Sequence, residues 1–171
     1  MVLHQPYFYT QTIHDHKKLL VDDNLKMIII NSWQYLVRKK LIKIFGYVIM
    51  PNHLHLIWKM LKMNGKEMCS ESFSKFTGHE FKRYLINENK ELLTEYYSDK
   101  SDREFQFWKR DPLAIPLSGI NNFIQKLKYI HENPVKSNLT RVAEDYRWSS
   151  AGFYDYGYDE FGILTDFRDL L

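Results

Sequence analysis

The stretch between Ile42 and Lys59 is the feature that most constrains the fold of this chain. It reads Ile42-Lys43-Ile44-Phe45-Gly46-Tyr47-Val48-Ile49-Met50, then Pro51-Asn52, then His53-Leu54-His55-Leu56-Ile57-Trp58-Lys59. Two runs rich in β-branched and aromatic residues, joined by two turn-forming residues, are typical of a β-hairpin. The sequence therefore predicts an antiparallel sheet with this hairpin in it.

The segments around the hairpin carry patterns of both strand and helix. Where apolar residues recur at spacings of three and four we expect helices, and where they alternate we expect strands. The expected elements are a strand at 7–13, a helix at 25–37, the hairpin, a helix from Ser70 or Ser72 to about 89, a strand at 105–109, and a helix from Ser118 to Asn133-Pro134. This order predicts the α+β class, with a small antiparallel sheet and packed helices.

Length and charge indicate one domain that is followed by an acidic C-terminal tail. A chain of 171 residues is long enough to bury a core without disulfides or metal. The net charge is +3, but residues 152–171 alone carry −4, which leaves +7 on the first 151 residues. We expect one domain at 1–155 and an acidic C-terminal extension at 156–171.

Several classes of protein are excluded or disfavoured. No apolar run approaches the ~20 residues of a membrane helix, and the first nine residues do not resemble a secretory signal, so we expect a cytoplasmic protein that does not contact membranes. The single cysteine, Cys69, excludes an internal disulfide and a multi-cysteine zinc site, and we expect it to be inert.

The first candidate for chemistry is the pair His53 and His55. Alternation along a strand places both imidazoles on one face, about 7 Å apart, where they can converge on one cation. The alternative is that two histidines occupy a solvent-facing strand without binding anything. A divalent ion needs at least one further protein ligand and open positions.

The last predicted helix offers a second candidate. With Ile120 at zero and 100° per residue, Tyr129 falls at about 180°, opposite the apolar stripe, and Asn133 lies one turn further on the same face. Lys126 shares this polar face. His131 faces the apolar stripe, so we interpret it as structural.

Two short segments of the sequence resemble a known family. The run at 51–56 (Pro-Asn-His-Leu-His-Leu) and the run at 129–136 (Tyr-Ile-His-Glu-Asn-Pro-Val-Lys) are similar to single-tyrosine HUH transposases, in the branch of the REP-associated tyrosine transposases. Residues 73–83, 107–110 and 146–150 resemble further parts of that family in the same order. The resemblance spans about residues 5–155.

The resemblance implies a ferredoxin-like HUH endonuclease domain with a specific site. His53, His55 and Asn133 would bind Mg²⁺ or Mn²⁺, and Tyr129 would be the nucleophile. The implied substrate is single-stranded DNA, often with an adjacent hairpin, and cleavage would leave a 5′-phosphotyrosine and a free 3′-hydroxyl. Related enzymes act as a monomer or a homodimer.

Basic clusters in the first 151 residues fit a polyanionic partner, although such clusters are also common on ordinary solvated faces. We expect phosphate contacts from basic side chains and base stacking on Trp108 or on exposed tyrosines. The expected DNA-binding residues are Arg38, Lys39, Lys40, Lys43, Lys82, Arg83, Trp108, Lys109, Arg110 and Lys126.

The sequence therefore predicts a transposase-like enzyme that nicks and rejoins single-stranded DNA through a tyrosyl–DNA intermediate. One alternative is a domesticated DNA- or RNA-binding protein that has lost cleavage. Another is a metal-dependent nuclease that uses water, in which Tyr129 is structural.

Overall fold

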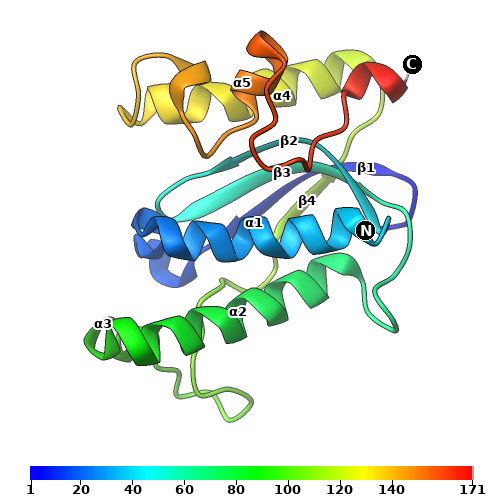
Figure 1. Ribbon diagram of the computed structural model, residues 1–171. Coiled ribbons are helices and arrows are strands. Elements are labelled where there is room, and N and C mark those ends of the chain that lie inside the picture. The colour runs from blue at the N-terminus through cyan, green and yellow to red at the C-terminus, as the bar shows by residue number, and fades with distance from the viewer. Residues whose placement is uncertain (171) are drawn as a thin grey trace.

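A computed structural model describes residues 1–170 and shows an α+β fold, as predicted (Figure 1). The sheet has the order β2-β3-β1-β4 and is antiparallel throughout. Its strands are β1 (Pro6–Thr12), β2 (Ile42–Ile49), β3 (His53–Met60) and β4 (Leu113–Pro116). The predicted hairpin is confirmed as β2 and β3, and its turn is closed by Met50 N–H donating to His53 O.

Helices cover both faces of the sheet (Figure 1). On one side lie α1 (Asp23–Arg38), α2 (Cys69–Glu88) and the short α3 (Lys90–Thr94). On the other lie α4 (Ile120–Lys136) and α5 (Ala151–Tyr156). The remaining helical turns are 3-10 turns at His14–His16, Leu19–Val21, Ala143–Asp145 and Phe167–Leu170.

Alternation in the strands divides the apolar side chains between two cores. In β1, Tyr7 and Tyr9 belong to the larger core beneath α1 and α2, while Phe8 points to the opposite face. The smaller core joins the sheet to α4 through Phe123, Leu127 and other residues. This smaller core is what fixes α4 against the strand that carries the two histidines.

Gly46 allows α4 to approach the sheet closely. It lies at an irregularity in the pairing of β2 with β3, between Ile44 and Gly46. A Cβ at this position would overlap Leu127 Cδ1 and lie 3.1 Å from Ile130 Cδ1. A side chain here would therefore push α4 outward.

The expected strand at 105–109 is wrong. Phe107 and Trp108 are both buried in the larger core, and adjacent residues on one side cannot alternate across a sheet. Only single bridges form here, at Phe105 and Trp108. The fourth strand follows later, at Leu113–Pro116, because it is this segment that pairs with β1.

The expected end of the last helix at Asn133-Pro134 is also wrong, because α4 continues to Lys136. Pro134 removes one hydrogen bond of the helix, but it lies in the final turn, two residues before the end, and Asn133 O still accepts from Ser137 N–H. The apolar stripe is narrower than expected, since Ile120 and Ile124 are exposed.

The division of the chain at residue 155 stays a prediction. In space, the described part of the predicted extension lies against the sheet: Phe161 is buried and stacks on Trp148, and Leu164 bridges to Ile44. Residue 171 of the extension lies outside the described residues. No helix within residues 1–170 combines the length and the apolar content needed to span a bilayer.

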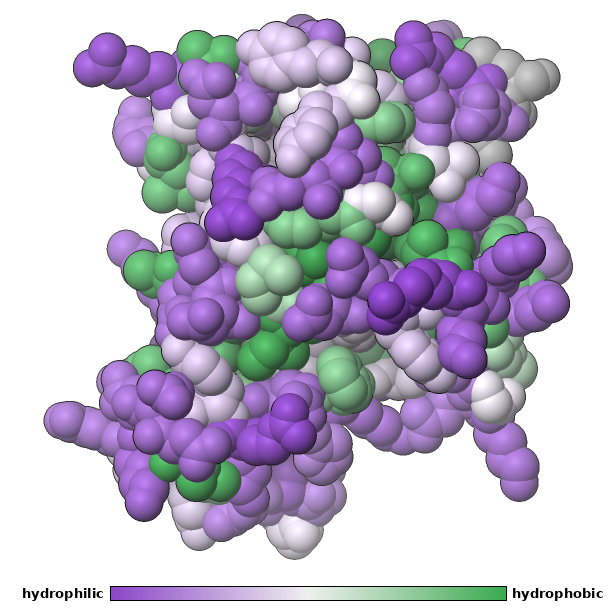
Figure 2. Space-filling model, viewed as in Figure 1, coloured by the Kyte–Doolittle hydropathy of each residue, from purple (hydrophilic) through white to green (hydrophobic). Residues whose placement is uncertain are grey.

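On the face seen in Figure 2, hydrophilic side chains cover the helices, and hydrophobic ones show mainly in the furrows between them.

Candidate active site

The two histidines lie on β3, on the sheet face that α4 covers. Their ring centroids are 4.7 Å apart. His55 is 6% exposed, and His53, at the start of the strand, is half-buried. The predicted common face of the pair therefore forms part of a partly enclosed site.

Each imidazole is held through its Nδ1 atom. Thr10 Oγ1, on the neighbouring strand β1, lies 2.8 Å from His55 Nδ1, and Asn52 Oδ1 lies 2.7 Å from His53 Nδ1. Because the Asn52 oxygen can only accept, His53 Nδ1 carries the proton in this arrangement. Residues 1–170 make no hydrogen bond to either Nε2, so both Nε2 atoms are free to meet a ligand.

The surroundings favour neutral imidazoles. Burial, with smaller contributions from His53 and Lys126, lowers the pKa of His55 to about 3. Burial, with a smaller contribution from His16, lowers the pKa of His53. A neutral imidazole is the form that binds a metal ion.

Tyr129 of α4 lies beside this pair. Its ring centroid is 5.4 Å from that of His55 and 5.9 Å from that of Phe8, which itself stacks on His55 at 5.2 Å. The tyrosine is 41% exposed, so its ring is accessible from solvent. A phenol carried by a helix thus meets one imidazole of a pair carried by a strand.

Asn133 lies one helical turn beyond Tyr129, and it is not bonded to either imidazole. Its Nδ2 donates to the main-chain oxygen of Tyr129 at 2.7 Å, which leaves Oδ1 without a partner among residues 1–170. Within the same residues, no cluster of three His, Cys, Asp or Glu side chains could hold a metal. Two imidazole nitrogens and one amide oxygen are nevertheless a donor set that suits a divalent ion with open positions.

His131 lies on the opposite side of α4 from Tyr129, in agreement with the structural interpretation. Its Nε2 lies 2.8 Å from Ser150 Oγ, and this hydroxyl accepts from Tyr47 N–H. Burial lowers the pKa of His131 to about 4. The residue therefore joins α4 to β2 and to the segment before α5.

The expected DNA-binding residues do not form one surface. Arg38, Lys39 and Lys40 are exposed at the C-terminal end of α1. Lys43 faces Lys59 across the open end of the hairpin, whereas the histidines lie at the closed end. Of the expected residues, only Lys126 lies at Tyr129, with its Nζ 5.5 Å from the ring centroid.

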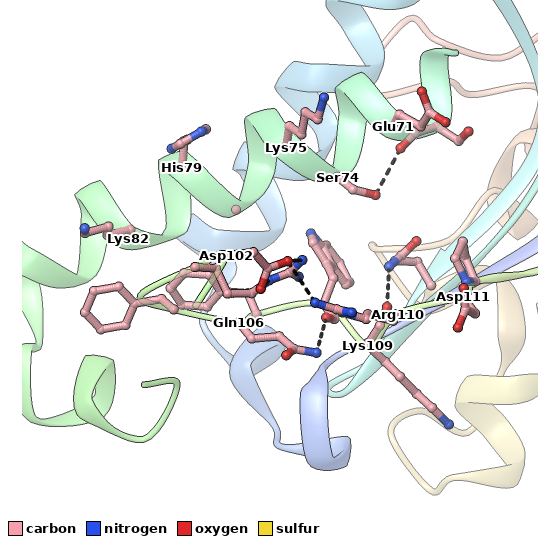
Figure 3. A pocket seen from close by; sticks show the side chains of 18 of the residues that line it. Glu71, Ser74, Lys75, His79, Lys82, Asp102, Gln106, Lys109, Arg110 and Asp111 are labelled. Atoms are coloured by element: carbon pink, nitrogen blue, oxygen red, sulfur yellow. Dashed lines mark hydrogen bonds and ion pairs between the residues drawn. The ribbon is translucent and has the colours of Figure 1, made fainter. Parts of the chain in front are cut away.

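Four further expected residues line a groove of about 620 Å³ between α2 and the segment 102–112, namely Lys82, Trp108, Lys109 and Arg110 (Figure 3). Carboxylates offset part of the charge there, since Lys82 pairs with Glu104 at 2.5 Å and Arg110 with Asp102 at 2.9 Å. Arg83, outside the lining, pairs with Glu80. The groove lies on the α2 side of the sheet, away from Tyr129.

Trp108 needs a correction. An exposed ring for base stacking was expected, but Trp108 is 7% exposed and its Nε1 donates to Thr77 Oγ1 at 2.8 Å. The indole belongs to the larger core, where it packs near Phe73 and Phe81. The residues that sequence reasoning missed are Phe8 and Thr10, whose common face on β1 becomes significant only through its pairing with β3.

Fold and geometry together define a class of domain: an α+β sheet that presents paired imidazoles to a tyrosine on a covering helix. No family model and no curated protein matches the chain. Among solved structures, it is similar to a REP-associated tyrosine transposase bound to a REP hairpin, with 15% sequence identity and a TM-score of 0.63. The similarity covers 96% of this chain and 88% of that chain. The chain therefore shares the fold of that transposase.

Proposed function

We propose that this protein is a metal-dependent enzyme that nicks and rejoins single-stranded DNA through a 5′-phosphotyrosine on Tyr129. The observation that carries the proposal is the contact between the Tyr129 ring on α4 and the His55 ring on β3, 5.4 Å between centroids. The Tyr129 ring is 41% exposed beside the histidine pair, and among residues 1–170 neither histidine Nε2 atom has a hydrogen-bond partner.

The reaction needs few steps. The Tyr129 oxygen attacks the phosphorus, the bond from phosphorus to the 3′-oxygen breaks, the phenol proton passes to solvent and the 3′-oxygen takes up a proton. The DNA 5′-phosphate is then esterified to Tyr129. Since this ester conserves the energy of the phosphodiester, attack by another 3′-hydroxyl joins a new strand and frees the tyrosine.

His53, His55 and Asn133 would hold the metal, Mg²⁺ or Mn²⁺. When bound, it would supply a positive charge that offsets the cost of ionising a phenol and stabilises the pentavalent transition state. The protein contributes the orientation: Thr10 and Asn52 fix the two imidazoles, and α4 fixes the tyrosine for in-line attack.

The proposed substrate is a single strand next to a hairpin. The solved transposase with the same fold is bound to a REP hairpin, which supports a DNA partner of this kind.

The test is covalent trapping. A pool of 3′-labelled single strands, with random sequence on the 5′ side of a fixed hairpin, is incubated with the protein and Mn²⁺ and then denatured. We expect a labelled protein band from the wild type and none from Tyr129→Phe or from a sample with EDTA. A Tyr129→Phe variant that still cleaves would indicate attack by water, and wild-type binding without any cleavage would indicate a binding protein.

A further inference from the structure

One lysine of α4 differs from its neighbours in what surrounds its charge. Lys126 lies one turn before Tyr129, and its Nζ is 4.8 Å from the centre of the Phe8 ring and 5.5 Å from that of Tyr129. The neighbouring Lys128 and Lys136 both pair with Glu132, at 3.7 Å and 2.7 Å. Within residues 1–170, no carboxylate forms an ion pair with Lys126.

Aromatic rings hold a cation without cancelling its charge, whereas a carboxylate cancels it. Lys126 is half-buried, so solvent screens its charge less than it screens that of the exposed Lys128. An anion that enters between α4 and the histidines therefore meets, next to the tyrosine, the charge of Lys126, which no carboxylate among residues 1–170 pairs with. The Nζ of Lys136 is 6.0 Å from the Tyr129 ring centroid, but it pairs with Glu132, which it shares with Lys128.

We propose that Lys126 is a further catalytic residue, whose ammonium binds a non-bridging oxygen of the scissile phosphate while Tyr129 attacks the phosphorus. This inference rests on the proposed function. The equatorial oxygens gain negative charge as the Tyr129–phosphorus bond forms and the bond to the 3′-oxygen breaks, so a fixed N–H donor stabilises the transition state more than the ground state. Lys126 keeps its proton throughout and exchanges none with substrate.

The first test compares two lysines of the same helix. Lys126→Met keeps an unbranched stem to pack on Phe8 but removes the charge, and Lys128→Met is the matched control on the exposed side. In single-turnover cleavage at saturating DNA and Mn²⁺, we expect a loss of about 10²–10³-fold for Lys126→Met and less than twofold for the control. Thermal unfolding of both variants should match the wild type, and equal cleavage rates for wild type and Lys126→Met would overturn the proposal.

The second test restores the cation chemically. The one native thiol, Cys69, is 0% exposed, so in Lys126→Cys the new thiol can be alkylated selectively by 2-bromoethylamine. The product carries an ammonium at nearly the length of lysine. We expect the cleavage rate to recover at least tenfold, whereas alkylation with the neutral iodoacetamide should restore nothing. Equal rates after both reagents would show that the charge is not what matters.

A binding measurement separates this inference from the proposed function. In a Tyr129→Phe background, which cannot form the adduct, loss of one phosphate contact makes the negative slope of log K against log salt about 0.7 shallower for a single strand. We expect this shallower slope for Lys126→Met and not for Lys128→Met. An unchanged slope for Lys126→Met would show that Lys126 does not contact a phosphate. Wild-type protein that never forms an adduct contradicts the proposed function, whereas an adduct rate that Lys126→Met leaves unchanged contradicts this inference alone.

Discussion

At the scale of residues, the site depends on atoms behind the imidazoles as much as on the imidazoles themselves. Thr10 Oγ1 and Asn52 Oδ1 engage the two Nδ1 atoms and leave both Nε2 atoms for a ligand. Hydrogen bonds of this kind fix the tautomer and the ring orientation of a metal-binding histidine.

We expect Thr10→Val to lower the affinity for Mn²⁺ by about 10–100-fold, because valine has the shape of threonine without the hydroxyl. Thr10→Ser, which keeps the oxygen, should stay within a few-fold of the wild type. Mn²⁺ titration followed by electron paramagnetic resonance measures this directly and does not depend on turnover. Equal affinities for the valine and serine variants would show that Thr10 does not orient His55.

His131 makes the fold sensitive to acid. The pKa of this imidazole is about 4 in the folded chain and 6.5 at its ordinary value, so the unfolded chain binds the proton more readily. The contribution of neutral His131 to the free energy of unfolding is therefore fully present above pH 6.5. It is lost as the pH falls toward 4, and the loss is about 3 kcal/mol at most. In His131→Gln, whose amide can still bond to Ser150, the free energy of unfolding measured with urea should depend less on pH over this range. An unchanged pH dependence would show that His131 is not the group responsible.

At the scale of elements, the docking of α4 on β2 decides whether the tyrosine reaches the histidines. We expect Gly46→Ala to destabilise the fold by about 1–3 kcal/mol, because the methyl group overlaps Leu127 Cδ1. Leu127→Ala in the same chain removes that overlap, so the double variant should be more stable than the sum of the two single changes. Denaturant unfolding of the wild type, the two single variants and the double variant measures the coupling between the two changes. Strictly additive changes in the free energy of unfolding would show that the contact between Gly46 and Leu127 does not limit how closely α4 approaches the sheet.

Features set by residues close together in the sequence could be predicted, whereas features set by contacts between distant residues could not. The hairpin and the polar face of α4 are set by local periodicity, so the common face of His53 and His55 and the side of Tyr129 were predictable. The fourth strand was not, because the alternation of 105–109 is local while pairing with β1 selects Leu113–Pro116. Thr10 was missed for the same reason, since only the register with β3 places it opposite His55.

At the scale of the whole molecule, charge is divided between two faces of the sheet. Cations of the groove beside α2 are partly paired with carboxylates, whereas Lys126 at the tyrosine pairs with no carboxylate in the described residues 1–170. The cluster at the end of α1 is exposed and lies at the end of the sheet away from the histidines. Cations in the groove and at the end of α1 suit general attraction of a polyanion rather than a direct role in cleavage.

We therefore expect the triple change Arg38→Gln, Lys39→Gln and Lys40→Gln to weaken binding of long single strands and to lower its salt dependence. The cleavage rate at saturating DNA should stay within twofold of the wild type, because none of the three side chains is near Tyr129. Fluorescence anisotropy at several salt concentrations, combined with single-turnover cleavage, separates the two effects. A large fall in the saturated rate would place this cluster in the active site after all.

The identity of the nucleophile is the claim on which the whole account depends, and peptide mapping of the trapped adduct tests it most directly. Trypsin cleaves after Lys128 and Lys136 and releases residues 129–136, a peptide with one tyrosine. We predict that mass spectrometry finds the DNA 5′-phosphate on this peptide and on no other. Attachment to a different peptide, or cleaved DNA that carries a free 5′-phosphate without any protein adduct, would contradict the account.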